Sequence, residues 1–472
     1  MEEFKIYSAG EFITTSNAIT IRNPYDQQVI AKTYKAGPEE LEKTIVKALS
    51  TEATMAGLPS WKRSAILLQI ADTLSDNFQS HAKILSMEAG KPLKYAIGEV
   101  KRAIQTFKVA SEEALRLPAE HLSLDWTPAG EGKEGWVKYF PVGLIAAISP
   151  FNFPLNLAAH KIAPALAAGN PIILKPASST PLSTLALAKI IDQTDLPKGA
   201  FSVLPMDRNS GNQLVTDERF KLLTFTGSPE VGWEMKKNAG KKPVVLELGG
   251  NAGVIIGKEA DIDLAVEKCL TGAFAYSGQV CIHAQRIFVE AEIFDAFMQK
   301  FKAKTENLKV GSPLKEDTDI SAMIDKNNAE RVQQWINEAK EQGAKIITGG
   351  TKEQTIVYPT ILTNTNNMMK VCALEVFGPV VAVEPFDDFS QAVDMVNDSR
   401  YGLQAGVFTN QIEQMNLAFR KLHVGGVIIN DVPTFRVDHM PYGGVKDSGI
   451  GREGIKYSIR DMMEARILVK NF

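Results

Sequence analysis

From Gly143 onward, short apolar runs alternate with stretches that carry the three-and-four spacing of helices. The runs are too short for buried helices, so we expect them to be buried strands. The expected strands are Leu144–Ile148, Pro171–Leu174, Phe201–Leu204, Lys221–Phe225 and Val244–Leu246, and the expected helices between them are Leu155–Ala168, Leu182–Thr194, Gly211–Thr216 and Glu230–Ala239. Parallel strands need crossover connections, which are usually helices. The alternation therefore predicts an α/β fold with a doubly wound parallel sheet.

A second alternating region runs from about Asn251 to Asn430. Its expected strands are Ala252–Ile256, Arg286–Val289, Ile356–Ile361, Val380–Pro385, Ala405–Phe408 and Gly426–Ile429, and its expected helices are Leu264–Tyr276, Ala291–Leu308 and Ala329–Gln342. The two regions share no repeated sequence, so we expect two different α/β domains.

Two further parts of the chain lie outside this alternation. Residues 38–117 carry helical spacing over Glu39–Leu49, Trp61–Leu85 and Tyr95–Leu115. Trp136–Phe140 and Ile467–Phe472 are isolated strand-like segments. Either segment is able to close a sheet within the chain or to extend a sheet in a partner subunit.

Length and charge exclude several classes of protein. A chain of 472 residues is too long for one ordinary core and suggests about three structural units. The net charge is −3 with no dense Lys/Arg block, so we expect neither nucleic acid nor a membrane surface as a partner. No apolar run approaches the roughly 20 residues of a membrane helix, and the first residues lack the pattern of a secretion signal. We expect a cytoplasmic protein.

The three cysteines and six histidines suggest no disulfide and no metal site. Without an export signal the thiols are expected to stay reduced, and no Cys or His pair has the spacing of zinc ligands. Cys269 and Cys372 fit ordinary buried positions. Cys281 differs because Gly278 precedes it in Gly-Gln-Val-Cys, where a tight turn could present the thiol in a cleft. Alone, this pattern still fits an inert buried thiol better than a nucleophile.

Two polar residues follow buried strands of the first region. Glu247 ends an apolar strand in Val-Val-Leu-Glu-Leu-Gly-Gly, where a desolvated carboxyl suits general-base work. Asn152 lies between two prolines in Ser-Pro-Phe-Asn-Phe-Pro, which could hold its amide as a rigid donor to an oxyanion. A carboxylate that caps the next loop and an ordinary Asx turn remain alternatives for the two residues.

Two other strand ends suit a nucleotide. Lys175 closes a strand in Lys-Pro-Ala-Ser178, and ligands of open α/β sheets bind beyond the carboxyl ends of strands. In Phe-Thr-Gly227-Ser228-Pro-Glu, the serine would cap a helix with proline at its first position, and a pyrophosphate could rest on that helix N-terminus. The spacing is not Gly-x-Gly-x-x-Gly, so the motif alone is a weak cofactor signal.

Together these segments closely resemble the aldehyde dehydrogenase family, in the same order and over nearly the whole chain. The matching motifs are Pro-Phe-Asn152-Phe-Pro, Lys175-Pro-Ala, Phe-Thr-Gly227-Ser228, Leu-Glu247-Leu-Gly-Gly, Gly-Gln-Val-Cys281, Leu-Glu375-Val-Phe377-Gly-Pro and Pro-Tyr-Gly-Gly444-Val-Lys-Asp-Ser-Gly449. Glu247 and Cys281 lie 34 positions apart, the usual interval in the family. The joint match favours functional roles for Cys281, Glu247 and Asn152.

The resemblance implies a mechanism. Cys281 attacks the aldehyde, and the Asn152 side chain and the Cys281 backbone N–H hold the oxyanion. Hydride passes to the nicotinamide and leaves a thioester, which water activated by Glu247 hydrolyses. The cofactor contacts implied are Lys175 at the adenosine ribose, Gly227 and Ser228 at the pyrophosphate, Glu375 at the nicotinamide ribose and Phe377 near the nicotinamide ring.

The resemblance also implies the domain plan. A variant Rossmann NAD(P)-binding domain with five strands would comprise residues 1–118 and 143–248, and a second α/β catalytic domain residues 249–440. An oligomerisation arm would comprise residues 119–142 and 455–472. Members of the family associate through this arm, so a homodimer or homotetramer is expected.

One departure from the family concerns the cofactor. NAD-preferring relatives often carry Glu three residues after the lysine, where this chain has Ser178. A serine removes a negative charge that would repel a 2′-phosphate. The cofactor is therefore expected to be NADP or NAD, with NADP use favoured. A second departure, Phe151 in place of a common Trp, concerns packing.

The substrate is expected to be a short hydroxylated or anionic aldehyde. Lactaldehyde and non-phosphorylating glyceraldehyde-3-phosphate dehydrogenases carry arginines at the positions that resemble Arg102 and Arg436, and guanidinium groups bind anions bidentately. His283, two residues after the cysteine, is a further candidate for substrate contact. Local salt bridges of both arginines, and a packed histidine, remain alternatives.

Three other functions remain open. A CoA-acylating dehydrogenase would release an acyl-CoA, but such relatives usually lack the residue that matches Glu247. A succinate-semialdehyde-type dehydrogenase differs only in substrate. A nucleotide-binding or structural protein that kept the fold would have no need of Cys281, Glu247 and Asn152 together.

Overall fold

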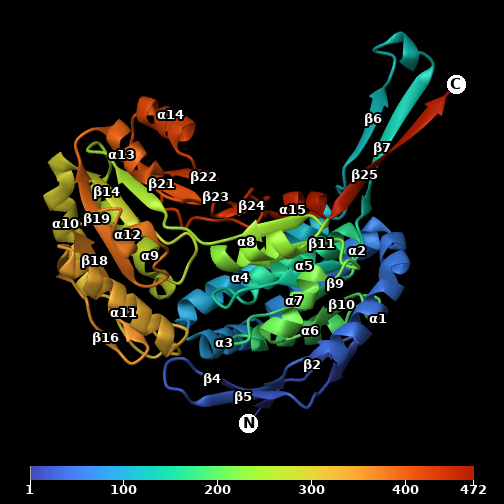
Figure 1. Cartoon of the computed structure of the whole chain (residues 1–472), viewed down its shortest axis with the longest axis horizontal. Coiled ribbons are helices and arrows are strands. Elements are labelled where there is room, and N and C mark those ends of the chain that lie inside the picture. The colour runs from blue at the N-terminus through green and yellow to red at the C-terminus, as the bar shows by residue number, and fades with distance from the viewer. Residues whose placement is uncertain (1) are drawn as a thin grey trace.

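The computed structural model describes residues 2–472 and contains two large sheets and a projecting arm (Figure 1). Five neighbouring strands of the first sheet are parallel, in the order β12-β11-β8-β9-β10. Their bounds are β8 Ile145–Ile148, β9 Ile172–Lys175, β10 Phe201–Val203, β11 Leu222–Thr226 and β12 Val244–Glu247. The chain moves one way from β8 and then returns to its other side, so the strand order reverses between β8 and β11. The predicted doubly wound sheet is confirmed.

Antiparallel strands extend both edges of this sheet. β24 (Gly449–Ile450) pairs with β12, while β2 (Ile6–Ser8) and β3 (Glu11–Ile13) continue beyond β10. The predicted domain plan left residues 441–454 unassigned, and they contain β24. The C-terminal part of the chain thus returns to the edge of the first sheet, where Gly449 pairs with Glu247.

Both faces of the first sheet are covered, because its strands are apolar on both sides. In β8, Ile145 and Ala147 belong to one hydrophobic core, whereas Ala146 and Ile148 belong to another. This is the period of two expected for a strand buried on both faces. The helices of this part are α1 Pro38–Gly57, α2 Ser60–Asp76, α3 Phe78–Ala89, α4 Leu93–Glu113, α5 Asn156–Ala168, α6 Leu182–Asp192, α7 Arg208–Thr216 and α8 Pro229–Asn238.

The second sheet has the order β15-β18-β19-β14-β13-β21-β22, with β15 antiparallel and the others parallel. Its strands are β13 Gly253–Ile256, β14 Arg286–Glu290, β15 Lys345–Thr348, β18 Thr360–Thr363, β19 Val380–Phe386, β21 Gln404–Phe408 and β22 Gly426–Ile429. Its helices are α9 Ile262–Phe274, α10 Ala291–Glu306, α11 Lys326–Glu341, α12 Lys370–Ala373, α13 Phe389–Asn397 and α14 Ile412–Lys421. The predicted second α/β region is confirmed.

The two isolated strand-like segments pair with each other and form the arm. β25 (Met463–Asn471) runs antiparallel to β7 (Lys133–Pro141), and β6 (Ala119–Ser123) pairs with the other side of β7. The arm projects from the body and carries the C-terminus (Figure 1). Ile467, Leu468 and Phe472 are exposed along it. Of the two alternatives, the structure shows closure within the chain.

Several element boundaries differ from the prediction. The expected helix Trp61–Leu85 is two helices, α2 and α3, because the Asn77 amide donates to the Thr73 carbonyl at 2.8 Å and ends α2. The expected strand Ile356–Ile361 is split between the hairpin strand β17 (Ile356–Val357) and β18.

The amino-terminal strands were not predicted, because they are short and partly exposed. The remaining elements are β1 Glu2–Glu3, β4 Ala18–Arg22, β5 Val29–Tyr34, β16 Lys352–Glu353, β20 Tyr401–Gly402, β23 Val445–Lys446, α15 Ile455–Asp461 and the 3-10 turns Pro128–Gly130 and Ala275–Gly278. In the described part of the chain no helix combines the length and apolarity needed to cross a membrane.

Candidate active site

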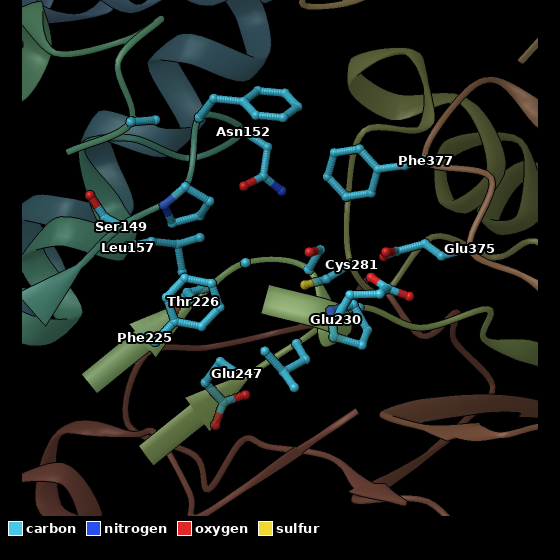
Figure 2. A pocket seen from close by; sticks show the side chains of 18 of the residues that line it. Ser149, Asn152, Leu157, Phe225, Thr226, Glu230, Glu247, Cys281, Glu375 and Phe377 are labelled. Carbon is cyan, nitrogen blue, oxygen red and sulfur yellow. The ribbon is translucent and has the colours of Figure 1, made fainter. Parts of the chain in front are cut away.

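A cavity of about 570 Å³ opens where the two sheets face each other (Figure 2). It lies at the carboxyl ends of β8, β11 and β12, at the reversal of strand order where open α/β sheets bind ligands. Across it lie residues that precede β13, β14 and β19. Seven of the predicted site residues line it together: Asn152, Gly227, Ser228, Glu247, Cys281, Glu375 and Phe377.

The loop that carries Cys281 requires glycine at position 278. Tyr276 and Ser277 adopt left-handed φ values of 51° and 54°, and Gly278 follows at 68°. A Cβ at Gly278 would lie 2.1 Å from the Gly378 carbonyl oxygen, so no other residue fits there. The predicted tight turn before Cys281 is confirmed. The turn also ends α9 at Phe274, two residues before the predicted end.

Gln279 ties this loop to its surroundings. Its amide oxygen accepts from the Ile324 N–H at 2.9 Å, and its backbone carbonyl accepts from the Asn152 side-chain amide at 3.0 Å. Asn152 is buried, and in Figure 2 its amide points into the cavity on the side of Cys281. One amide N–H of Asn152 is thus committed to the cysteine loop, which orients the group, and the second is free to serve a ligand.

A buried ion pair holds the Asn152 loop from behind. Lys91 donates to the backbone carbonyl of Asn152 at 2.5 Å and pairs with Glu99. Glu99 in turn accepts from the backbone N–H groups of Leu155 and Asn156 at 2.9 and 3.1 Å. Both ionic side chains are fully buried, and burial lowers the pKa of Lys91. No signal in the sequence indicates this pair, because Lys91 falls between the expected helices Trp61–Leu85 and Tyr95–Leu115 and Glu99 is a single charge within the second.

The Cys281 thiol is half-buried and contacts one polar side chain directly. Its Sγ lies 3.0 Å from the hydroxyl of Tyr442. Burial raises the pKa of the thiol to about 11, against the opposing influences of the Tyr442 hydroxyl and the Arg436 charge. A thiol in this state is protonated near neutral pH and needs help to become a nucleophile.

Glu247 lies at the end of β12 with 3% of its surface exposed. Within residues 2–472 neither of its carboxyl oxygens has a hydrogen-bond partner. Burial raises the pKa of this carboxyl well above its usual value, and the neighbouring Glu453 raises it further. In Figure 2 the carboxyl group is turned away from Cys281. It lies beside Gly443, where a Cβ would come within 2.9 Å of Oε1. An uncapped, desolvated carboxyl fits a base better than a loop cap.

Behind Glu247 lies a cluster of buried charges, the Arg436 cluster, formed by Arg102, His160, Lys161, Arg436, Asp438 and Glu453. Glu453 pairs with Arg436 at 2.9 Å and with Lys161 at 3.2 Å. Asp438 pairs with Arg102 at 2.8 Å and with His160 at 2.7 Å. Burial lowers the pKa of His160, so it is neutral near pH 7. The cluster therefore holds three cations against two carboxylates.

The cofactor side of the cavity fits a dinucleotide. Ser228 stands at the N-cap of α8 with Pro229 next, as predicted, but its hydroxyl makes no capping hydrogen bond, which corrects that expectation. The first N–H groups of α8 are therefore left for a ligand, and a helix N-terminus suits a phosphate. Glu375 accepts from the Gly250 N–H at 3.1 Å, and burial raises its pKa to about 8. Phe377 packs edge-on against Phe151.

Lys175 and Ser178 lie outside the lining of this cavity. Lys175 is at the end of β9 as predicted, and burial lowers its pKa. Ser178 donates to the Met206 carbonyl at 3.4 Å and lines a neighbouring cavity of about 670 Å³ together with Arg22 and Lys326. The adjoining Ala177 does line the main cavity, so the turn after β9 separates the two.

The three predicted substrate contacts each have a partner within the chain. His283 is buried, and its Nε2 lies 2.8 Å from the Ala273 carbonyl, as the packed alternative expects. Arg102 and Arg436 both form the local salt bridges of the Arg436 cluster and do not line the cavity. Arg436 still lies near the thiol, because its guanidinium stacks on the Tyr442 ring at 3.7 Å from the ring centre.

Among the described residues, no group of His, Cys, Asp and Glu is arranged to hold a metal ion.

Known proteins resemble this chain along almost its full length. The model of the aldehyde dehydrogenase family matches residues 12–468. The chain is 43% identical over 472 residues to the 3-sulfolactaldehyde dehydrogenase of Priestia megaterium. The alignment covers 100% of this chain and 98% of that protein. It is 42% identical over 469 residues to the lactaldehyde dehydrogenase of Methanococcus aeolicus, with 98% and 99% covered.

Solved structures agree with the fold. Aldehyde dehydrogenase 21 from Physcomitrella patens, in complex with the reaction product succinate, matches with a TM-score of 0.98 and 42% identity, covering 100% of this chain and 98% of that chain. The glyceraldehyde-3-phosphate dehydrogenase GapN from Methanocaldococcus jannaschii, complexed with NADP, matches with a TM-score of 0.92 and 37% identity, covering 96% and 99%. The chain therefore belongs to the aldehyde dehydrogenase family and is an NAD(P)-dependent aldehyde dehydrogenase.

Proposed function

We propose that this enzyme oxidises a short hydroxylated or anionic aldehyde to its free carboxylic acid, with Cys281 as the nucleophile. The observation that carries the proposal is the convergence of Cys281, Asn152 and Glu247 on one cavity from separate parts of the chain. In this mechanism the Cys281 thiolate attacks the aldehyde carbon. The Asn152 amide and the backbone N–H of Cys281 stabilise the oxyanion that forms.

Gly227, Ser228, Glu375 and Phe377 would hold NAD(P) in the main cavity, and Lys175 would reach its adenosine ribose. When bound, the cofactor would supply the acceptor for the hydride that leaves the Cys281 adduct as this adduct becomes a thioester. Glu247 then takes a proton from a water molecule, and the water oxygen attacks the thioester carbon. Its raised pKa and uncapped oxygens support this base role. Release of a free acid follows, because water and not CoA is the acceptor.

The excess positive charge of the Arg436 cluster supports an anionic or oxygen-rich substrate. Three cations face two carboxylates there, so the cluster places a net positive charge beside the cavity, which favours a negative group on the substrate. Arg436 is one aromatic ring away from the Cys281 sulfur. The relatives that are named for lactaldehyde and sulfolactaldehyde, both hydroxylated aldehydes, support the same class.

A succinate-semialdehyde-type activity is the second candidate, supported by the succinate in the Physcomitrella enzyme at 42% identity. A panel of lactaldehyde, sulfolactaldehyde, succinate semialdehyde and uncharged propanal, each run with NAD and NADP, separates the two candidates by kcat/KM. Product analysis with added CoA tests the acceptor. Formation of acyl-CoA, with no free acid in its absence, would contradict the hydrolytic mechanism.

The substrate class is tested on Arg436. Arg436→Ala is expected to lower kcat/KM for the hydroxylated or charged aldehyde by about ten- to a hundredfold more than for propanal, since a hydrogen-bonded charge pair is worth roughly 1.5–3 kcal/mol. The comparison between the two substrates on the same variant cancels any general damage. Equal losses for both substrates would remove the anion site from the proposal.

We also propose that the arm formed by β6, β7 and β25 joins subunits into a dimer or tetramer. Its exposed Ile467, Leu468 and Phe472 support this role, because contact with a partner subunit would remove these apolar side chains from water. The domain bounds expected from the sequence, residues 1–118 with 143–248 and residues 249–440, remain part of the same proposal.

A further inference from the structure

Tyr442 stands between the reactive thiol and the Arg436 cluster. Its hydroxyl lies 3.0 Å from Cys281 Sγ, and its ring carries the Arg436 guanidinium at 3.7 Å from the ring centre. The ring is fully buried, as part of a small apolar cluster with Val280, Ile282 and Leu403. In the sequence, Tyr442 is one position of the Pro-Tyr-Gly-Gly motif and carries no signal of its own.

The backbone around Tyr442 fixes the phenol in place. Tyr442 and Glu453 exchange backbone hydrogen bonds at 2.9 and 2.6 Å, in an isolated antiparallel bridge. The Glu453 carboxylate also holds Arg436 against the other side of the phenol ring. Position and orientation of the hydroxyl are therefore set by groups that do not depend on Cys281. A preorganised donor of this kind costs no rearrangement when charge appears on the sulfur.

We propose that Tyr442 is a catalytic residue whose hydroxyl donates a hydrogen bond to the Cys281 thiolate and so increases the fraction of enzyme with an ionised nucleophile. This inference rests on the proposed function, in which Cys281 attacks the aldehyde. The direction of the bond follows from acidity. A phenol and a thiol are each able to donate, but the thiol loses its proton first, and the remaining donor is the tyrosine.

The charged groups around the sulfur act in both directions. Arg436 and the Tyr442 hydroxyl favour the thiolate, whereas burial and the carboxyl groups of Glu375 and Glu247 oppose it. Burial raises the pKa of Tyr442 well above its usual value, so the phenol keeps its proton where the thiol titrates. The Arg436 guanidinium over the ring opposes that rise and strengthens the phenol as a donor.

The hydrogen bond also has a cost for reactivity. A thiolate that accepts a hydrogen bond is a weaker nucleophile than a free one, and after attack the sulfur becomes a poor acceptor. Tyr442 therefore raises the number of ionised thiols at neutral pH and lowers the reactivity of each. This double effect distinguishes a thiolate donor from a residue that only packs against the cysteine.

The test measures thiol ionisation without aldehyde or cofactor. The rate of alkylation of Cys281 by iodoacetamide is followed from pH 6 to 10, below the midpoint of the thiol titration, with the modified peptide quantified by mass spectrometry. In Tyr442→Phe this rate is expected to fall about threefold at every pH of the range. Loss of a hydrogen bond to a charged group raises the thiol pKa by about one unit and so lowers the ionised fraction about tenfold, while each thiolate reacts roughly threefold faster.

Tyr7→Phe is the matched control. Tyr7 is also buried and its hydroxyl donates to Asp192 at 2.7 Å, but it lies in β2, away from the cavity. This variant should keep the wild-type rate of alkylation and the wild-type activity. The control thereby separates the effect of losing any buried tyrosine hydroxyl from the effect of losing the hydroxyl that contacts Cys281.

Three outcomes are distinguishable. A slower alkylation of Cys281 in Tyr442→Phe alone supports the inference. An unchanged or faster rate, while alkylation of Cys281 still abolishes aldehyde oxidation, overturns the inference and leaves the proposed function intact. Alkylation of Cys281 that leaves aldehyde oxidation intact overturns the proposed function, and the inference with it.

Discussion

The two sheets build the site with opposite ends of their strands. The first sheet contributes residues at the carboxyl ends of β8, β11 and β12, which are neighbours in the sheet. The second contributes Gly250, Cys281 and Glu375 from loops that precede β13, β14 and β19, which are also neighbours. The cavity is the gap between a carboxyl edge and an amino edge.

The difference matters because the two edges offer different chemistry. Helices begin after the carboxyl ends of parallel strands, so the first sheet presents α8 with its N–H groups to the cavity. At the amino edge of the second sheet the preceding helix ends instead, and α9 runs out into the Cys281 loop. On this side the reactive groups are side chains, the Cys281 thiol and the Glu375 carboxyl, and Asn328 at the start of α11 also lines the cavity. The carboxyl edge thus adds the N–H groups of α8 to the Asn152 and Glu247 side chains, whereas the amino edge supplies the thiol.

The largest effects should separate the two edges by reaction step. Cys281→Ser, on the amino edge, is expected to lower kcat by at least about 10⁴-fold, because no thiohemiacetal forms. Glu247→Gln, on the carboxyl edge, should lower kcat by roughly 10²–10⁴-fold through slow hydrolysis. Because the thioester would still form, this variant should release one equivalent of NAD(P)H per active site in a pre-steady-state burst.

Cys269→Ser serves as the control for this pair, since Cys269 is fully buried in α9 and lies outside the cavity lining. Activity should remain close to that of the wild type. Absence of a burst in Glu247→Gln would place the role of Glu247 before hydride transfer, for instance at the ionisation of Cys281, and both edges would then share the first step.

The carboxyl edge was largely predictable from the sequence and the amino edge was not. Asn152, Lys175, Ser228 and Glu247 follow apolar strands, so the rule for open α/β sheets points to them from local pattern alone. No comparable rule applies to the residues before a strand. Cys281 and Glu375 were found through the family motifs, and only the preceding glycine gave a physical reason for the cysteine turn.

Long-range pairs were missed for a different reason. Lys91 contacts Asn152 61 positions later, and Glu453 joins Lys161 292 positions earlier. A buried ion pair leaves no periodic signal in either segment, since each partner appears as a single charge in an apolar stretch. For the same reason the partners of Arg102 and Arg436 could not be named from the sequence. Their salt bridges were expected only as an alternative to a free anion site.

Glu375, on the amino edge, should make cofactor binding depend on pH. A protonated Glu375 is a poorer acceptor for ribose hydroxyls, and the pKa of about 8 means that most of the free enzyme carries this proton at pH 7. Binding to the ionised form must release it. Affinity for NADH, measured by nicotinamide fluorescence, is therefore expected to rise with pH by up to about tenfold per unit below pH 8 and to level off above it.

Glu375→Gln removes the titrating group, so its affinity should be lower at pH 8.5 and flat across the same range. NADH is the suitable probe because it lacks the 2′-phosphate, which titrates on its own. A wild-type profile with no slope between pH 6 and 8 would mean that Glu375 stays ionised or does not contact the ribose, and the cofactor would then depend on the carboxyl edge alone.

The smallest expected effect tests the far end of the carboxyl edge. Ser178→Glu should lower kcat/KM with NADP on the order of tenfold relative to NAD, because a carboxylate near the ribose repels a 2′-phosphate across a partly screened distance. Ser178→Gln has nearly the same size without the charge and should change the ratio little. The structure makes this test sharp, since Ser178 faces the neighbouring cavity while Ala177 faces the main one. An equal response to both substitutions would mean that the turn after β9 selects the cofactor by shape, whereas a strong preference of the wild type for NAD would refute the argument from the missing carboxylate.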